Sequence, residues 1–241
     1  MSRLPFFSAR MIAMPGRGEK ELQLLKREGI PVHRFEAIRP TPDMMQATVA
    51  PGKKFTKGEV GCNLSHRALW TELLSQPEGS TMLILEDDVE LPMHHDRKKP
   101  LSDQIAEFMR GVPEDWGIVF LGRCWDLCWA CKRINQNTVQ TKNALCTHAY
   151  ALTQKAARLL LASNDPQALA VDHDIKRLLR KEQIKAYARS PQQLLQQNPQ
   201  VSSTLRMITY RLPQCIEPIV LACLVFILVI VGMGLSLRRL K

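Results

Sequence analysis

The stretch MLILEDD, residues 82–88, decides the expected fold. Four apolar residues run directly into three carboxylates, Glu86, Asp87 and Asp88. An apolar run of this length predicts a buried strand, and open α/β sheets bind their ligands at the carboxyl ends of such strands. Because side chains alternate along an extended chain, Glu86 and Asp88 are expected on one face and Asp87 on the other. The cluster predicts a site for a hard divalent cation, with a solvated acidic turn as the alternative.

Strand and helix patterns alternate on both sides of this stretch. Further strands are expected at residues 30–38, 116–122 and 149–152, and helices at 19–26, 65–74, 101–110 and 154–162. This alternation predicts an α/β sheet flanked by helices. The expected organisation is a domain over residues 1–190, a Gln-, Ser- and Pro-rich linker over 191–217, and an anchor with a basic tail over 218–241.

The composition limits the partners of this chain. Its 241 residues support one substantial core with appendages, and its formal net charge is +10. A basic balance favours a nucleic acid, an anionic membrane surface or a phosphate-rich small molecule. The sequence has no basic run interleaved with aromatic residues and no nucleic-acid motif, so nucleic acid is not expected as a partner.

Residues 219–237 are nineteen consecutive residues without a charge. As a helix they span roughly 28 Å, close to the hydrocarbon thickness of about 30 Å, and they predict a single-pass membrane anchor in contact with the lipid bilayer. The first eight residues lack the apolar core of a signal peptide, so the default expectation is a cytosolic catalytic domain. The basic tail after residue 237 would then be translocated, against the positive-inside rule, and the orientation stays open.

Several motifs follow one another in a fixed order along the chain. They are GEVGC at 58–62, LSH at 64–66 with Trp70, LILEDDV at 83–89, DW at 115–116 leading to LG at 121–122, and THAYALT at 147–153 with Ala157 and Leu160. In this order they resemble glycosyltransferase family 25, the group of lipooligosaccharide and procollagen galactosyltransferases. The resemblance covers roughly residues 10–205.

The resemblance implies a GT-A-type nucleotide-sugar-binding fold, a UDP-sugar donor, a divalent metal such as Mn²⁺, and inversion at the anomeric carbon. The carboxylates 86–88 then stand where GT-A enzymes carry an Asp-x-Asp motif. Asp88 is the expected direct metal ligand, and Glu86 and Asp87 are expected to contact metal-bound water or the nucleotide ribose. A carboxylate-held cation suits this chemistry because it neutralises the leaving nucleoside diphosphate as a Lewis acid.

Three residues, Lys57, Glu59 and His66, lie in the segment that the family places near the donor. Each has a structural alternative: a solvated lysine, a helix cap and a hydrogen-bonded helix residue, respectively. Arg17 is the expected counterpart of the arginine-rich donor loop. The preceding residues depart from the family, whose first strand usually ends in Ile-Asn-Leu, so the donor loop is expected to be shortened.

An inverting transfer needs a base for the acceptor hydroxyl. VDHD at residues 171–174 lies where the family has a late acidic motif, so Asp172 and Asp174 are the candidates. The alternative is a helix N-cap and a first-turn carboxylate ahead of IKRL, a position that the helix dipole favours. One residue can serve both purposes.

Four of the seven cysteines, Cys124, Cys128, Cys131 and Cys146, lie near His148 in the sequence. Spacings of two and three residues suit a structural Zn²⁺ site. Disulfides would require an oxidising compartment. Free, partly buried thiols are the third alternative, and the sequence leaves all three open.

The leading hypothesis is a metal-dependent, inverting glycosyltransferase that moves a hexose, galactose first, from a UDP-sugar to a hydroxyl of a glycan or protein. The shortened donor loop motivates a second hypothesis, a catalytically inactive glycosyltransferase-like interaction protein anchored in the membrane. A third, a basic adaptor at the membrane surface, rests on charge and anchor alone. The sequence does not decide the sugar, the acceptor, the organelle or the oligomeric state.

Overall fold

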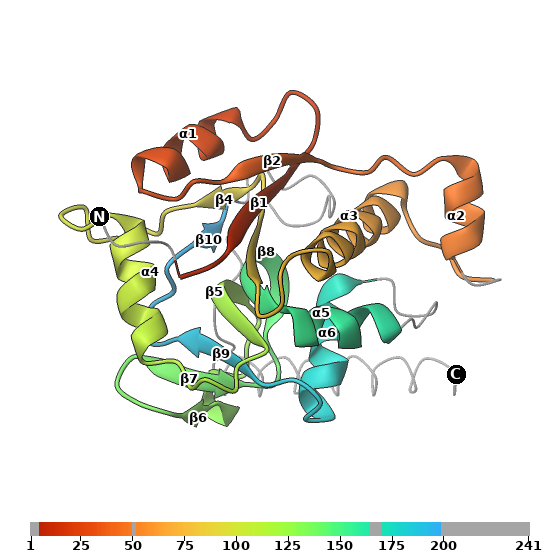
Figure 1. Ribbon diagram of the computed structural model, residues 1–241. Helices are drawn as coiled ribbons and strands as arrows, with labels where there is room; N and C mark the ends of the chain where they lie inside the picture. Colours follow the sequence, from red (N-terminus) through yellow and green to blue (C-terminus); the bar gives the residue numbers. More distant parts are fainter. Residues whose placement is uncertain (1–4, 50–51, 164–169, 199–241) are drawn as a thin grey trace, which may run out of the picture.

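The computed structural model describes residues 5–49, 52–163 and 170–198 (Figure 1). An eight-stranded mixed sheet has the strand order β2-β1-β3-β8-β5-β9-β7-β6. Its strands are β1 (Ser8–Ala13), β2 (His33–Glu36), β3 (Thr81–Glu86), β5 (Ile118–Cys124), β6 (Lys132–Arg133), β7 (Thr138–Thr141), β8 (Leu145–Thr153) and β9 (Ala186–Arg189). Two short strands, β4 (Val89–Glu90) and β10 (Gln196–Gln197), form a separate antiparallel pair.

Strand directions bring the ends of β1, β3 and β5 to one edge of the sheet. β1 pairs in parallel with β2 and β3, while β8 lies antiparallel between β3 and β5. Residue Ala149 of β8 is opposite both Leu85 and Gly122, so β8 begins where its neighbours end. We call this edge, comprising residues 13–18, 86–88, 124 and 145–148, the carboxylate edge.

Helices cover both faces of the sheet (Figure 1). α1 (Glu19–Arg27) and α4 (Leu101–Arg110) pack on one face, and α3 (Lys57–Leu74), α5 (Gln154–Ala162) and α6 (Val171–Arg180) pack on the other. Alternation along β3 explains the two cores: Met82 and Ile84 pack with Trp70 of α3, whereas Leu83 and Leu85 lie in the second core. α2 (Pro42–Thr48) and a 3₁₀ turn, η1 (Cys128–Ala130), complete the described elements.

Most of the expected helices match the structure, and α3 is the exception. It begins at Lys57, eight residues before the expected start at residue 65, so the predicted start of this helix was wrong. Thr56 and Glu59 start the helix early with a capping box, in which the Glu59 N–H donates to Thr56 Oγ1 at 3.2 Å and the Thr56 N–H donates to Glu59 Oε2 at 2.8 Å. α5 begins at the expected residue, because the Thr153 side chain caps the helix by accepting the N–H of Ala156.

Residues 191–198 were expected to begin a linker, but they fold back onto the domain. The N–H groups of Leu194 and Leu195 both donate to the carbonyl of Leu121, and Leu195 is fully buried. The apolar side chains of this segment therefore belong to the core. The rest of the expected linker and the predicted anchor at 219–237 lie outside the described residues. Within the described ranges, no helix is both long enough and apolar enough to cross a membrane.

Candidate active site

The three carboxylates that end β3 have different partners, and Asp87 binds the loop after β1. Its Oδ2 accepts the N–H of Met14 at 2.9 Å, and its Oδ1 accepts from Arg17 Nη2 at 2.9 Å. Burial raises the pKa of Asp87, while these two contacts act in the opposite direction. Gly18 allows the close approach, because its φ is +83° and a Cβ there would lie 3.3 Å from the Cβ of Asp87. Asp87 thus holds the predicted donor loop, with Arg17, against the sheet.

Glu86 lies toward α3, on the other face of the sheet, where its carboxylate accepts two hydrogen bonds. Its Oε1 accepts from Thr147 Oγ1 at 2.6 Å and from His66 Nε2 at 3.3 Å. Burial acts to raise the pKa of Glu86, but His66 and then Thr147 outweigh it, so the pKa is lowered. Glu86 is therefore a preorganised, ionised carboxylate.

The direction of the hydrogen bonds behind Glu86 follows from Trp70. An indole N–H only donates, so the 2.9 Å contact from Trp70 Nε1 makes the Tyr150 oxygen an acceptor. The proton of Tyr150 then points to His66 Nδ1, 2.9 Å away, which leaves Nε2 as the ring nitrogen that donates to Glu86. Burial raises the pKa of Tyr150 well above its usual value, so the phenol keeps that proton. This relay, Trp70–Tyr150–His66–Glu86, orients the carboxylate from within the core.

Asp88 is left incompletely bonded. Its Oδ2 accepts from Gln197 Nε2 at 2.8 Å, whereas its Oδ1 is buried and accepts no hydrogen bond from the described residues. Burial, followed by the charge of Glu86, raises the pKa of Asp88 to about 7. An unsatisfied buried carboxylate oxygen is unfavourable, and a divalent cation would satisfy it and keep it ionised. The oxygen donors of Asp88 and Glu86 thus fit the predicted metal.

Asp172 and Asp174 both lie in the first turn of α6 but have different surroundings. Asp174 is 2% exposed and forms an ion pair with Arg177, one helical turn later, at 2.9 Å. Asp172 is half-buried, and its Oδ2 accepts the N–H of Cys146 at 3.3 Å. Cys146 is in the left-handed region with φ +67°, and its N–H points from the carboxylate edge to α6. Asp172 therefore faces the site, whereas Asp174 stabilises the helix.

Cys62 of α3 shows that these acids share one site. Burial raises the pKa of the Cys62 thiol well above its usual value, and the charges of Glu86, Asp172 and Asp88 raise it further. Its Sγ, a nitrogen of His66 and an oxygen of Glu86 lie within 4.8 Å of one another. A neutral thiol thus lies near carboxylates from two separate segments of the chain, the end of β3 and the start of α6.

The remaining residues predicted near the donor all lie in α3. Lys57 is exposed at the first position of the helix. Glu59 already caps the helix, and His66 is fully buried, so His66 acts on the edge through Glu86. Glu59 is therefore a helix cap and His66 a hydrogen-bonded helix residue, which are the structural alternatives that the sequence offered for them.

The sequence did not predict roles for Thr147, Tyr150 or Gln197. Tyr150 could have been found, because it carries the only polar group of the expected strand 149–152; in the structure it is opposite Ile84 and so lies on the face of Glu86. Gln197 had no such signal, since it fell in the expected linker. Its contact with Asp88 depends on the chain returning to β4.

Cys124 and Cys146 form a disulfide, so this pair follows one of the three alternatives that the sequence left open. Cys131 is a free thiol that donates to Asp126. The four-cysteine zinc set is not assembled: in the described part of the chain, the donor atoms of Cys124 and Cys146 cluster with His148 instead. Burial lowers the pKa of His148 to about 4, against smaller raising effects of the Glu86 charge and the Leu195 carbonyl.

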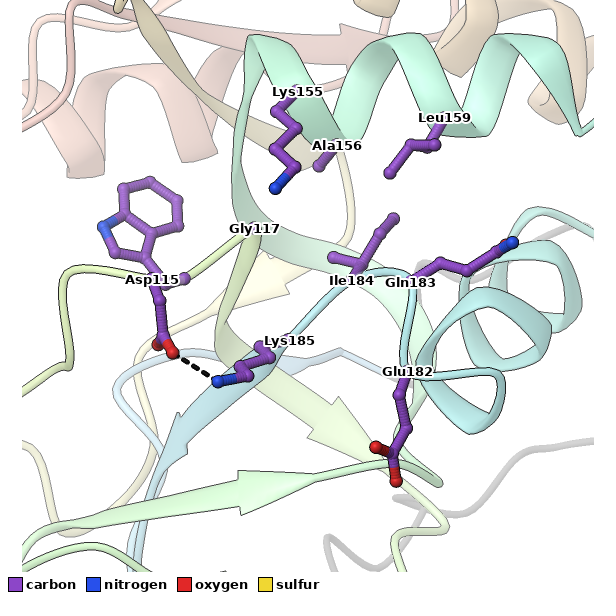
Figure 2. A pocket seen from close by; sticks show the side chains of 10 residues that line it. Asp115, Gly117, Lys155, Ala156, Leu159, Glu182, Gln183, Ile184 and Lys185 are labelled. Carbon is purple, nitrogen blue, oxygen red and sulfur yellow. Dashed lines mark hydrogen bonds and ion pairs between the residues drawn. The ribbon is translucent and has the colours of Figure 1, made fainter.

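A cavity of about 250 Å³ lies away from the carboxylate edge, and Figure 2 shows the residues that line it. Gly117, just before β5, lines it together with Lys155, Ile184, and an ion pair between Asp115 and Lys185. The carboxylate edge lies at the opposite end of β5, at Cys124. The cavity therefore contains none of the predicted site residues.

Comparison with known proteins connects this geometry to a family. The family model of glycosyltransferase family 25 (LPS biosynthesis protein) matches residues 13–175, which include the carboxylate edge and Asp172. The chain belongs to glycosyltransferase family 25. The matched region starts at the end of β1 and ends within α6.

Curated relatives of this family 25 chain include proteins named as galactosyltransferases and proteins named as inactive. Human "Procollagen galactosyltransferase 2" is 26% identical over 147 residues, which cover 56% of this chain and 22% of that protein. Human "Inactive glycosyltransferase 25 family member 3" is 30% identical over 122 residues, which cover 46% of this chain and 18% of that protein. A "Putative glycosyltransferase" of Haemophilus influenzae is 31% identical over 159 residues, which cover 61% of this chain and 53% of that protein. The chain thus spans about a fifth of the two human proteins and half of the bacterial one. Its identity to the human protein named inactive is no lower than its identity to the one named a galactosyltransferase.

Proposed function

We propose that this protein is a metal-dependent, inverting glycosyltransferase with a GT-A-type site. It moves a hexose, galactose first among the candidates, from a UDP-sugar to a hydroxyl of a glycan or protein. The observation that carries the proposal is the unsatisfied Oδ1 of Asp88 beside the ionised Glu86, at the carboxyl end of a central strand. Family membership supports the reaction class.

Asp88 and Glu86 would hold the divalent cation, with Mn²⁺ as the first candidate. The cation would neutralise charge on the leaving nucleoside diphosphate. Gln197 fixes one oxygen of Asp88, leaving the other for the metal, while Thr147 and His66 keep Glu86 charged. Such fixed donors lower the reorganisation needed during the reaction.

Arg17 and Asp87 would bind the donor through the loop after β1. The side chain of Arg17 is 26% exposed, and its guanidinium pairs with Asp87 at the carboxylate edge, where a diphosphate would reach it. Arg34 supports the loop by donating to the carbonyl of Met14 at 2.6 Å. Lys57, exposed at the start of α3, remains a predicted contributor of positive charge.

Asp172 would be the base. It would take the proton of the acceptor hydroxyl, whose oxygen would bond to the anomeric carbon as the bond from that carbon to the diphosphate oxygen breaks. Asp174 is a weaker candidate for this role, because its carboxylate already forms the buried pair with Arg177. The Asp172 carboxylate is half-buried, and its known partner is a backbone N–H.

The test is a screen of nucleotide sugars for hydrolysis and transfer by the full-length protein, with Mn²⁺ and after chelation. We expect metal-dependent release of UDP from one donor and loss of that release in Asp88→Asn. The exposed Asp43→Asn on α2 is the matched control and should behave as wild type. UDP release that is equal with and without metal would contradict the proposal.

The second candidate function is a catalytically inactive family member that retains the fold for interaction. Relatives named inactive favour it, as does the engagement of Arg17 by Asp87. This function predicts no UDP release from any donor and no Mn²⁺-dependent donor binding by calorimetry. Binding without turnover would instead indicate an acceptor missing from the assay.

We also propose, from the sequence alone, that residues 219–237 anchor the protein in a bilayer. Carbonate extraction of membranes tests this: an anchored protein stays in the pellet. Protease protection in sealed vesicles then gives the orientation. The Cys124–Cys146 disulfide makes that measurement informative, because disulfides persist in oxidising compartments and are rare in the cytosol.

A further inference from the structure

A second cluster of metal-type donors lies where β5 ends and β8 begins. Cys124 and Cys146 are joined there, and a ring nitrogen of His148 lies within 4.8 Å of both sulfurs. Cys124 is 2% exposed and His148 is 1% exposed, whereas Cys146 is only half-buried. The cluster is therefore enclosed except on the side of Cys146.

His148 is the observation that points to a ligand. Neither of its ring nitrogens makes a hydrogen bond of normal geometry with any described residue, although buried polar groups are nearly always paired. The surroundings of the ring are specific. A Cβ on Gly122 would lie 2.2 Å from His148 Nε2 and 2.6 Å from the carbonyl oxygen of Leu195, so glycine makes the room that the imidazole occupies.

The neighbouring carbonyl matches the second shell of metal-bound histidines. Such histidines usually donate their other ring N–H to a carboxylate or a backbone carbonyl. With its proton on Nε2, beside the Leu195 carbonyl, His148 would offer the lone pair of Nδ1. Two thiolates and a neutral imidazole are the ligands that zinc prefers, whereas the oxygen ligands of Glu86 and Asp88 suit Mn²⁺.

We propose that reduction of the Cys124–Cys146 disulfide creates a Zn²⁺ site formed by Cys124, Cys146 and His148. A dithiol reductant supplies two electrons and two protons, which break the S–S bond and give two thiols, while the reductant becomes a disulfide. Zn²⁺ then displaces the two thiol protons to solvent and binds both thiolates and the imidazole. Water enters from the side of Cys146 and takes the remaining position.

The test uses Co²⁺ as a spectroscopic substitute for Zn²⁺ on the full-length protein. The protein is reduced with a dithiol, freed of reductant without oxygen, and saturated with Mg²⁺ to occupy oxygen-ligand sites. We expect a thiolate-to-cobalt charge-transfer band at one equivalent, displaced by Zn²⁺ and absent from protein that was never reduced. Reduced wild type without the band would overturn the proposal.

Variants assign the ligands. Cys124→Ser and His148→Ala should weaken Co²⁺ binding by roughly a hundredfold or more, because each removes a direct ligand. Cys131→Ser is the matched control, since its thiol contacts Asp126 outside the cluster, and it should retain the band. A band that survives in His148→Ala, or that is lost in Cys131→Ser or Cys62→Ser instead, would overturn the assignment. If Cys124→Ser does not fold, His148→Ala alone decides, because it leaves the disulfide intact before reduction.

Discussion

The end of β3 and the start of α6 carry the same acidic pattern, two carboxylates separated by one residue. At β3, Asp88 Oδ1 has no donor within the described part of the chain, and its pKa is raised to about 7. At α6, Asp174 is as deeply buried but is paired with Arg177 at 2.9 Å. The difference teaches that burial alone does not identify a catalytic acid. The donors that face each oxygen decide its role.

Local geometry explains why the two pairs differ. A helix places residues three apart on one face, so α6 supplies Arg177 to Asp174 from within itself. The chain that turns after β3 supplies no such neighbour, and Asp88 must take its donor from Gln197, 109 residues away. The acids of β3 are therefore more dependent on a ligand.

The strongest test of this comparison is Asp88→Asn. We expect roughly a hundred- to thousandfold lower metal-dependent turnover, because the substitution removes the charge that would hold the cation. Calorimetry with Mn²⁺ and a UDP-sugar should show the matching loss of donor affinity. Asp43→Asn serves as the control, and unchanged affinity in Asp88→Asn would remove Asp88 from the metal site.

The pH dependence of stability sharpens the same contrast. The pKa of Asp88 is raised when the protein folds, so folded, metal-free protein binds more protons than unfolded protein between about pH 4 and pH 7. Its free energy of unfolding should therefore fall as pH rises through this window, by at most roughly 4 kcal/mol, and level off above it. Denaturant titrations should show a flatter profile for Asp88→Asn. A steep fall in that variant would place the titrating group elsewhere.

Substitutions at α6 separate its two acids. Asp172→Asn should lower turnover by roughly a hundredfold while donor affinity is kept, as expected for loss of a base. Asp174→Asn should retain most turnover and lower the free energy of unfolding by about 1–3 kcal/mol, because Arg177 loses its buried partner. If Asp174→Asn lost turnover and Asp172→Asn lost only stability, the roles assigned to the two acids would be wrong.

The relay behind Glu86 should give the smallest effect. Tyr150→Phe leaves His66 Nδ1 without its donor and weakens the preference for a proton on Nε2. We expect roughly tenfold lower turnover, as is usual when a group that orients a metal ligand is lost, and an upward shift of the acidic limb of the pH–rate profile as the pKa of Glu86 rises. Trp70→Phe is the control for a smaller change, because it removes only the indole N–H that donates to Tyr150 and keeps the contact between Tyr150 and His66. A lower melting temperature with an unmoved pH profile would mean that the relay is structural.

Local patterns predicted much of the fold. The apolar run before Glu86 and the extents of α4 and α5 depend on residues that are neighbours in the chain. The start of α3 was predicted too late although Thr56 and Glu59 are also neighbours, because the helix cap was offered only as an alternative role for Glu59. The Asp174–Arg177 pair at spacing three was likewise visible in the sequence.

The sequence by itself determined that three carboxylates follow a buried strand, because strand period and burial are properties of adjacent residues. Only the tertiary structure decided what each one does. Asp87 binds Arg17, and Glu86 accepts hydrogen bonds from His66 and Thr147. Asp88 keeps one oxygen that accepts no hydrogen bond from the described residues and is available to a ligand. Their partners come from segments that chain folding brings to one sheet edge, and the pKa of a carboxylate depends on those spatial neighbours rather than on sequence order.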